Sequence, residues 1–159
     1  MPRRPVSLSR RARDRLSEPV AGPRPVAAAV CFRRRDQQLQ FRLIRTRDGE
    51  RWTFPNGGPE AHETPSQAAA REAAQEAGVT GVIAERPLTE YRHGRRGDDL
   101  ATAFLLAVQS SAPFAGAGRD PTWFNLEHTL EKLAENRDLA AAAELQRVVE
   151  LAERELEDG

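Results

Sequence analysis

Residues 57–79 have the sequence GGPEAHETPSQAAAREAAQEAGV. The middle of this stretch carries several independent signals for one helix. Thr64 supplies an N-cap hydroxyl, Pro65 suits the first helical position because it has no amide hydrogen to leave unpaired, and Gln67 completes a capping box with Thr64. Gly78 is the residue type that most readily adopts the left-handed conformation after a helix end. The stretch therefore predicts a helix that begins at Pro65 and ends before Gly78.

The predicted helix has two chemically different sides. At 3.6 residues per turn one face collects small apolar residues, namely Ala70, Ala73, Ala74 and Ala77. The opposite face collects polar residues, namely Glu72, Gln75 and Glu76. An alanine face lets a helix approach a sheet closely, which also holds the side chains of the other face still. The polar face alone is compatible with plain exposure to solvent, so the residues around the helix decide its role.

Two carboxylates on this helix are suited to a hard cation. Glu72 and Glu76 lie one helical turn apart, so both can reach the same ion. Hard cations such as Mg²⁺ or Mn²⁺ prefer oxygen ligands of this kind. Gly57, in the loop before the helix, allows close approach of a backbone carbonyl. These residues predict a divalent-cation site.

The spacing along the stretch matches a known motif. Gly57 is followed by five residues and Glu63, then by seven residues and Arg71, and Gly78 closes the pattern. This arrangement resembles the Nudix box, in which the helix carries an Arg-Glu pair and later a Glu-Glu pair. The second pair is Gln75-Glu76 here, so one expected glutamate is replaced by an amide.

The resemblance implies a fold and a set of roles. The implied fold is α/β, a Nudix-type α/β/α sandwich with a mixed β-sheet between helices. The implied activity is metal-dependent hydrolysis of a diphosphate linkage, with Mg²⁺ or Mn²⁺ as cofactor. The implied catalytic residues are Glu72, Glu76 and Arg71. The implied metal ligands are Gly57, Glu72, Gln75 and Glu76, supported by Glu63 and Gly58.

Gln75 leaves the activity open between two readings. An amide oxygen can still ligate a cation, but it is neutral and cannot take a proton. One reading is an active hydrolase with fewer acidic ligands. The other is a noncatalytic ligand-binding protein that keeps the fold.

Three segments outside the box extend the resemblance over roughly residues 24–140. Residues 24–33, 51–55 and 118–124 are similar to their counterparts in the diphosphoinositol polyphosphate and diadenosine polyphosphate phosphohydrolase branch. The resemblance implies phosphate contacts for Arg24, Arg47 and Arg119, and hence a nucleoside- or inositol-type polyphosphate as substrate. Ordinary surface charge is the alternative for these arginines, and a nucleoside triphosphate pyrophosphatase is an alternative activity with the same metal site.

Hydrophobic patterning places the remaining elements. Strands are expected at residues 26–32, 39–46, 52–54, 81–90 and 101–108, helices at 126–134 and 138–156, and a break in regular structure at 55–59. The runs 26–32 and 101–108 are apolar throughout, which is typical of central strands buried on both faces. Residues 1–24 are rich in arginine and proline and are expected to form a mobile arm before a domain at 25–159.

A polar segment and three aromatic residues could each belong either to a binding site or to another part of the fold. Arg92, His93, Arg95 and Arg96 belong to a polar segment over residues 91–99 that forms either a pocket rim or an exposed loop. The aromatic residues Trp52, Trp123 and Phe124 either stack on a nucleobase or belong to the core.

Length and composition limit the class of protein. A chain of 159 residues fits one domain, and its 24 basic and 24 acidic residues give no net charge to attract nucleic acid or a membrane surface. The single cysteine, Cys31, excludes an intrachain disulfide, and it lies in an apolar run that predicts a buried thiol. With no long apolar run and no signal-like N-terminus, we expect a cytoplasmic protein whose partner is a phosphorylated small molecule.

Overall fold

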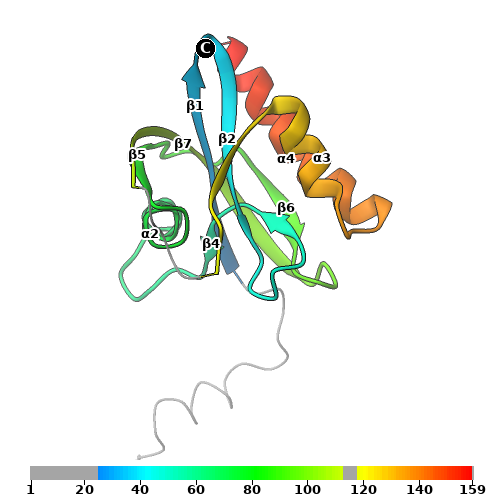
Figure 1. Cartoon of the computed structure of the whole chain (residues 1–159). Coiled ribbons are helices and arrows are strands. Elements are labelled where there is room, and N and C mark those ends of the chain that lie inside the picture. The colour runs from blue at the N-terminus through cyan, green and yellow to red at the C-terminus, as the bar shows by residue number, and fades with distance from the viewer. Residues whose placement is uncertain (1–24, 113–117, 159) are drawn as a thin grey trace, which may run out of the picture.

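The computed structural model describes residues 25–112 and 118–158 (Figure 1). Its strands are β1 (Pro25–Arg35), β2 (Gln38–Arg45), β3 (Trp52–Thr53), β4 (Asn56–Gly57), β5 (Val79–Ile83), β6 (Thr89–His93), β7 (Asp99–Ser111) and β8 (Thr122–Asn125). Its helices are α2 (Pro65–Ala77), α3 (Leu126–Ala134) and α4 (Leu139–Asp158). The predicted arm at residues 1–24 lies outside the described residues.

Strand β1 is the centre of the sheet. It pairs with β2 in antiparallel register, with Cys31 opposite Arg42, and with β7 in parallel register, from Pro25 opposite Leu100 to Phe32 opposite Ala107. The main path of the sheet is β3-β2-β1-β7-β5, with β4, β6 and β8 attached to its sides. The sheet is therefore mixed, and the two apolar runs occupy adjacent central strands as the sequence predicts.

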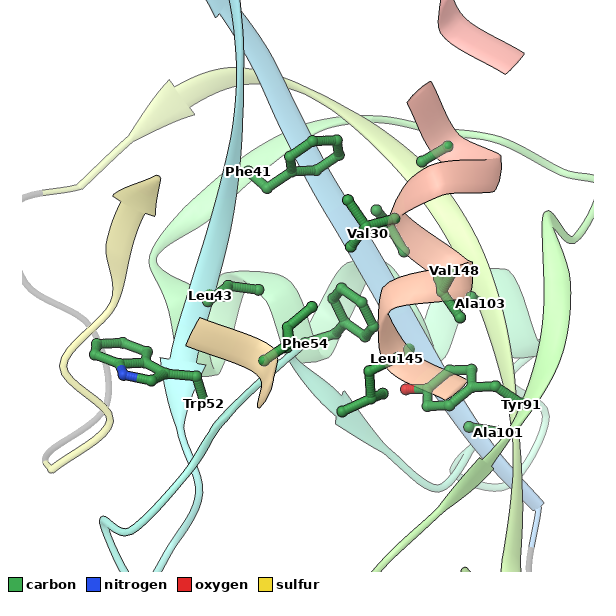
Figure 2. Close-up of a cluster of buried hydrophobic side chains, with 14 residues drawn as sticks. Val30, Phe41, Leu43, Trp52, Phe54, Tyr91, Ala101, Ala103, Leu145 and Val148 are labelled. Carbon is green, nitrogen blue, oxygen red and sulfur yellow. The ribbon is translucent and has the colours of Figure 1, made fainter. Parts of the chain in front are cut away.

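Two hydrophobic cores lie on opposite faces of this sheet. Alternate residues of β1 serve them in turn: Ala28 and Val30 belong to one core, while Ala27, Ala29 and Cys31 belong to the other. Large side chains fill the first core, shown in Figure 2, which includes Phe41, Leu43, Trp52, Phe54, Tyr91, Leu145 and Val148. Figure 1 shows α4 and α3 covering that face and α2 covering the other, which confirms the α/β/α sandwich.

Helix α2 has the predicted ends. The Thr64 hydroxyl accepts a hydrogen bond from the Gln67 amide at 3.2 Å, the Gln67 side chain accepts one from the Thr64 amide at 2.9 Å, and Gly78 has φ 68°. The buried face of α2 differs from the predicted one. Its fully buried residues are Ala68, Ala69, Ala73 and Ala77. Ala74 is exposed and Ala70 only partly buried. This orientation of the helix leaves Glu72 and Glu76 beside the sheet, and Gln75 toward solvent.

The strand predicted over residues 81–90 is wrong in its extent. The chain forms β5, bends through residues 84–88, and continues as β6 along the same edge of β7. The bend stays bonded to β7, because the amides of Ala84 and Leu88 donate to the carbonyls of Leu105 and Ala103 at 2.8 and 2.7 Å. The long strand β7 thus pairs with both short strands, β5 and β6.

Two further expectations need correction. Residues 55–59 are not wholly irregular, because β4 pairs with Ala27 and Ala28 of β1. The segment 91–99 begins as strand β6, in which Tyr91 is buried in the first core. Helix α3 has the predicted bounds, and α4 begins beside the predicted cap Asp138, whose carboxylate accepts from the Ala141 amide at 2.8 Å.

Candidate active site

The carboxylates of Glu72 and Glu76 lie against the short strand β4. The Asn56 amide donates a 3.0 Å hydrogen bond to Oε1 of Glu76. A Cβ atom placed on Gly57 would lie 1.9 Å from Oε2 of Glu72, so no side chain fits between that backbone and the carboxylate. Because β4 is paired with the central strand β1, the backbone at residues 56–57 is a fixed wall for both carboxylates.

Arg71 connects the loop to the helix. Its Nε and Nη2 donate to the two carboxylate oxygens of Glu63 at 2.8 and 3.0 Å, and Nη2 also donates to the Gly58 carbonyl at 3.2 Å. Its Nη1 donates to Oε2 of Glu72 at 3.1 Å and to the amide oxygen of Gln75 at 3.3 Å. Hydrogen bonds from Arg71 hold the pKa of Glu63 below its ordinary value, and those to Glu63 raise the pKa of Arg71. Both glutamates and the glycine loop are therefore tied to one guanidinium.

Glu76 is paired with a second arginine from a distant part of the chain. Nη2 of Arg119 lies 3.1 Å from Oε2 of Glu76, and each side chain is only 13% exposed. Burial raises the pKa of Glu76, against the opposing effects of the Asn56 amide and of Arg119. The Arg119 backbone carbonyl accepts a 2.6 Å hydrogen bond from the Arg45 amide, which fixes Arg119 to the end of β2.

These groups fit a hard divalent cation. The described residues contain no group of three or more Asp, Glu, His or Cys side chains that could hold a metal ion, and the two carboxylates of α2 that lie beside β4 are Glu72 and Glu76. The Gly57 backbone lies against the Glu72 carboxylate, whereas the Gln75 side chain is exposed and its amide oxygen accepts from Nη1 of Arg71 at 3.3 Å. The space that a Cβ at Gly57 would fill is taken by the Glu72 carboxylate, so this carboxylate lies directly against the Gly57 backbone. Two carboxylates with neutral oxygens and water are an ordinary environment for Mg²⁺.

A cleft of about 960 Å³ opens beside these carboxylates. Its lining includes Gly57, Gly58 and Glu76. Among the described residues the cleft is also lined by seven arginines, namely Arg47, Arg51, Arg92, Arg95, Arg96, Arg119 and Arg137. Such a concentration of guanidinium groups is suited to a ligand with several negative charges.

Two of these arginines were not predicted from the sequence. Arg51 precedes Trp52, and Arg137 follows α3, where Nη1 donates to the Leu133 carbonyl at 2.8 Å. Burial, and then the charge of Arg51, lower the pKa of Arg137 to about 10. Nε of Arg51 is buried without a hydrogen-bond partner in the described part of the chain. Both arginines lie beside predicted elements in the sequence, but no local pattern indicates that they line the same cleft.

The structure places most of the other candidate residues at the cleft. Arg47 and Arg119 line the cleft, whereas Arg24 lies outside the described residues. The rim alternative holds for the polar segment, since Arg92, His93, Arg95 and Arg96 all line the cleft. Arg95 also forms an ion pair with Asp48 across the opening.

The aromatic residues behave as core residues. Trp52 is 4% exposed and packs edge-on against Phe124, with ring centroids 5.1 Å apart. Trp123 lies beneath the guanidinium of Arg33, 4.0 Å from the ring centroid, and packs against the core on the α2 face. Cys31 is buried as predicted, and burial raises the pKa of its thiol to about 12.

Comparison with known proteins identifies the family. The NUDIX domain profile matches residues 23–145. The chain belongs to the Nudix family. It is 31% identical over 111 residues to the mouse diphosphoinositol polyphosphate phosphohydrolase 3-alpha, covering 67% of each chain, and 30% identical over 139 residues to Nudix hydrolase 4 of Arabidopsis thaliana, covering 79% of this chain and 67% of the relative. This Nudix chain is accordingly a hydrolase that acts on phosphoanhydride bonds.

Solved structures confirm the Nudix fold. The C. elegans Ap4A hydrolase superimposes with a TM-score of 0.67 at 21% identity, covering 84% of this chain and 98% of that one. The NUDIX domain of Shewanella oneidensis NrtR, solved with ADP ribose, also gives 0.67 at 18% identity and covers 94% of this chain and 99% of that one. In the described part of this Nudix chain, no helix is both long enough and apolar enough to cross a membrane.

Proposed function

We propose that this Nudix hydrolase cleaves a diphosphate linkage in a nucleoside- or inositol-type polyphosphate with the help of Mg²⁺ or Mn²⁺. The observation that carries the proposal is the junction of the carboxylate pair with the arginine-lined cleft, where Glu76 and Arg119 are in direct contact. A polyphosphate suits both parts of this site. Its negative charges would bind the arginines, and the divalent cations that it recruits would bind the carboxylates. The name of the mouse relative, a diphosphoinositol polyphosphate phosphohydrolase, supports this substrate class.

We assign the metal to oxygen atoms of Gly57, Glu72, Gln75 and Glu76. A divalent cation bound there would neutralise charge on nonbridging phosphate oxygens and lower the pKa of a nearby water. Arg71 acts as an orienting residue, because its fork fixes Glu72 relative to the loop. Glu63 supports the site by holding that fork in place.

We assign the substrate phosphates to Arg24, Arg47 and Arg119, and add Arg51 and Arg137 from their position in the cleft. Guanidinium forks match pairs of phosphate oxygens, so arginines on separate segments can grip consecutive phosphates. Burial and then the charge of Arg51 lower the pKa of Arg137, and a phosphate bound beside Arg137 would offset that repulsion. Cytoplasmic location and a phosphorylated small-molecule partner remain predictions from the sequence.

A phosphate-release screen with Mg²⁺ or Mn²⁺ tests the proposal. The panel is inositol pyrophosphates, dinucleoside polyphosphates, nucleoside triphosphates and nucleotide sugars, and we expect the first two classes to be best. Glu76→Gln should lower turnover by at least ~10²-fold, while Glu150→Gln, on the exposed side of α4, should not. A preference for nucleoside triphosphates would favour the pyrophosphatase alternative. Tight binding of these compounds with no turnover would favour the noncatalytic alternative.

A further inference from the structure

Both carboxylate oxygens of Glu76 are already engaged. Oε1 accepts the Asn56 amide at 3.0 Å, and Oε2 contacts Nη2 of Arg119 at 3.1 Å. A backbone amide is neutral and can stay in place beside a metal ligand. A guanidinium carries a full positive charge, so it opposes a divalent cation at the same oxygen. Cation binding at Glu76 therefore competes with Arg119.

The surroundings of Arg119 allow its guanidinium to bind either Glu76 or a ligand in the cleft. Its backbone carbonyl accepts from the Arg45 amide, so a new rotamer of the side chain would leave this backbone contact in place. Its Nε is buried and has no hydrogen-bond partner within the described residues, so the pair with Glu76 leaves the guanidinium incompletely bonded. The same side chain lines the cleft, where a phosphate group would offer two acceptors to its fork.

We propose that Arg119 exchanges Glu76 for a substrate phosphate when a divalent cation binds. Without metal, Arg119 neutralises the buried Glu76. With metal at Glu76, Arg119 is released toward the cleft and becomes a phosphate-binding residue. The proposal rests on the proposed function, because it assumes that the cation uses Glu76. Its consequence is that metal and substrate each strengthen the binding of the other, as linkage requires.

Arg47 provides the matched control for this exchange. Arg47 lines the same cleft and its charge acts on Glu76, but the described structure gives it no ion pair with that carboxylate. Removing either charge reduces long-range repulsion of a cation. Only removal of Arg119 also frees a carboxylate oxygen.

The test measures Mn²⁺ affinity from the electron paramagnetic resonance signal of the free ion, without substrate, in full-length protein. We expect Arg119→Gln to bind Mn²⁺ at least about 5-fold more tightly than Arg47→Gln, the lower range of measured couplings between sites. A merely structural role for Arg119 predicts the opposite sign, because a damaged site binds metal less well. Equal affinities, or weaker binding by Arg119→Gln, would overturn the exchange.

Adding methylenediphosphonate, a diphosphate analogue that is not hydrolysed, tests the coupling. Its direct contact with the ion is common to both variants, so the comparison isolates the two arginines. The analogue should increase Mn²⁺ affinity at least about 5-fold more in Arg47→Gln than in Arg119→Gln. An equal increase in both variants would contradict the exchange.

A measurement on the wild type covers the case in which Arg119→Gln does not fold. In protein with ¹⁵N-labelled arginine, Mg²⁺ should release the restricted rotation of one guanidinium, assigned to Arg119 with the variant Arg119→Lys. No change in that signal at saturating Mg²⁺ would overturn the proposal. The expected Mn²⁺ affinities without phosphate release from any substrate would leave the exchange standing and contradict only the proposed hydrolysis.

Discussion

Glu63 and Arg71 form a two-point ion pair, with Nε and Nη2 of the arginine 2.8 and 3.0 Å from the two carboxylate oxygens. The pair joins the loop before α2 to the helix itself. It also fixes the direction in which Nη1 of Arg71 reaches Glu72. A loop residue thereby determines where a helix carboxylate lies.

Glu63→Gln should lower metal affinity or turnover by about 10- to 100-fold, the usual effect of removing a residue that supports a metal ligand. The matched control is Glu60→Gln, since Glu60 lies 3.8 Å from Arg71 but is 68% exposed. Because the pKa of Glu63 is lowered in the folded protein, its contribution to stability is present above the ordinary value of 4.5 and is lost as the pH falls below it. Urea unfolding should therefore show the wild type and Glu63→Gln converging in acid. A difference that is constant from pH 7 to pH 3 would contradict this role.

Gly57→Ala should abolish most metal binding, because the new Cβ atom would lie 1.9 Å from Oε2 of Glu72 and force the carboxylate away. We expect a loss of ~10²-fold or more in turnover, comparable to the loss of a positioned group. Gly58→Ala is the steric control, since its nearest contact would be the Pro25 carbonyl at an ordinary 3.7 Å. Mn²⁺ titration and phosphate release check both variants. Equal losses in the two would show that the backbone at this loop, and not the Glu72 position, is responsible.

Gln75→Glu should tighten metal binding, because it adds a third carboxylate beside Glu72 and Glu76. The side chain at this position already reaches Arg71, at 3.3 Å from Nη1, so the new charge would also compete for that guanidinium. We expect higher activity at limiting metal and a more metal-dependent melting temperature. Parallel Mn²⁺ titrations of both proteins measure the change. Unchanged metal affinity would mean that position 75 does not face the cation.

His93 should make the fold less stable in mild acid. Burial lowers the pKa of His93 below 6.5, although Asp99 acts in the opposite direction. The unfolded chain therefore takes up the proton first as the pH falls through 6.5, and the folded state loses stability by at most about 1.4 kcal/mol per pH unit. His93→Asn should flatten the fall in unfolding free energy between pH 7 and pH 5, whereas the variant of the exposed His128, His128→Asn, should retain it. An unchanged slope in His93→Asn would assign the pH dependence to other groups.

The sequence predicted best those features that depend on neighbouring residues. The ends of α2 follow from Thr64, Gln67 and Gly78, which act on the backbone within one turn. The central position of β1 follows from its unbroken apolar run, which needs no knowledge of its partners. Motif spacing likewise singled out Glu72 and Glu76, and both side chains lie against β4.

Features that depend on distant partners were predicted poorly. Residues 81–90 look like one strand because nothing local shows that β7 is long enough to pair with two. Ala74 lies on the predicted apolar face, but the contacts with the sheet turn the helix toward Ala68 and Ala69 instead. The charge of Arg51 acts on Arg137 and both line the cleft, although they are far apart in the chain.

The two sides of the cleft differ in how strongly packing restricts their residues. The helix wall rests on four fully buried alanines, Ala68, Ala69, Ala73 and Ala77, where any larger side chain would displace the carboxylates. The opposite wall is built from exposed arginines such as Arg47, Arg95 and Arg96, whose exchange costs the core nothing. Substitutions of these arginines would therefore change the charge of the cleft and leave the packing of α2 on the sheet intact.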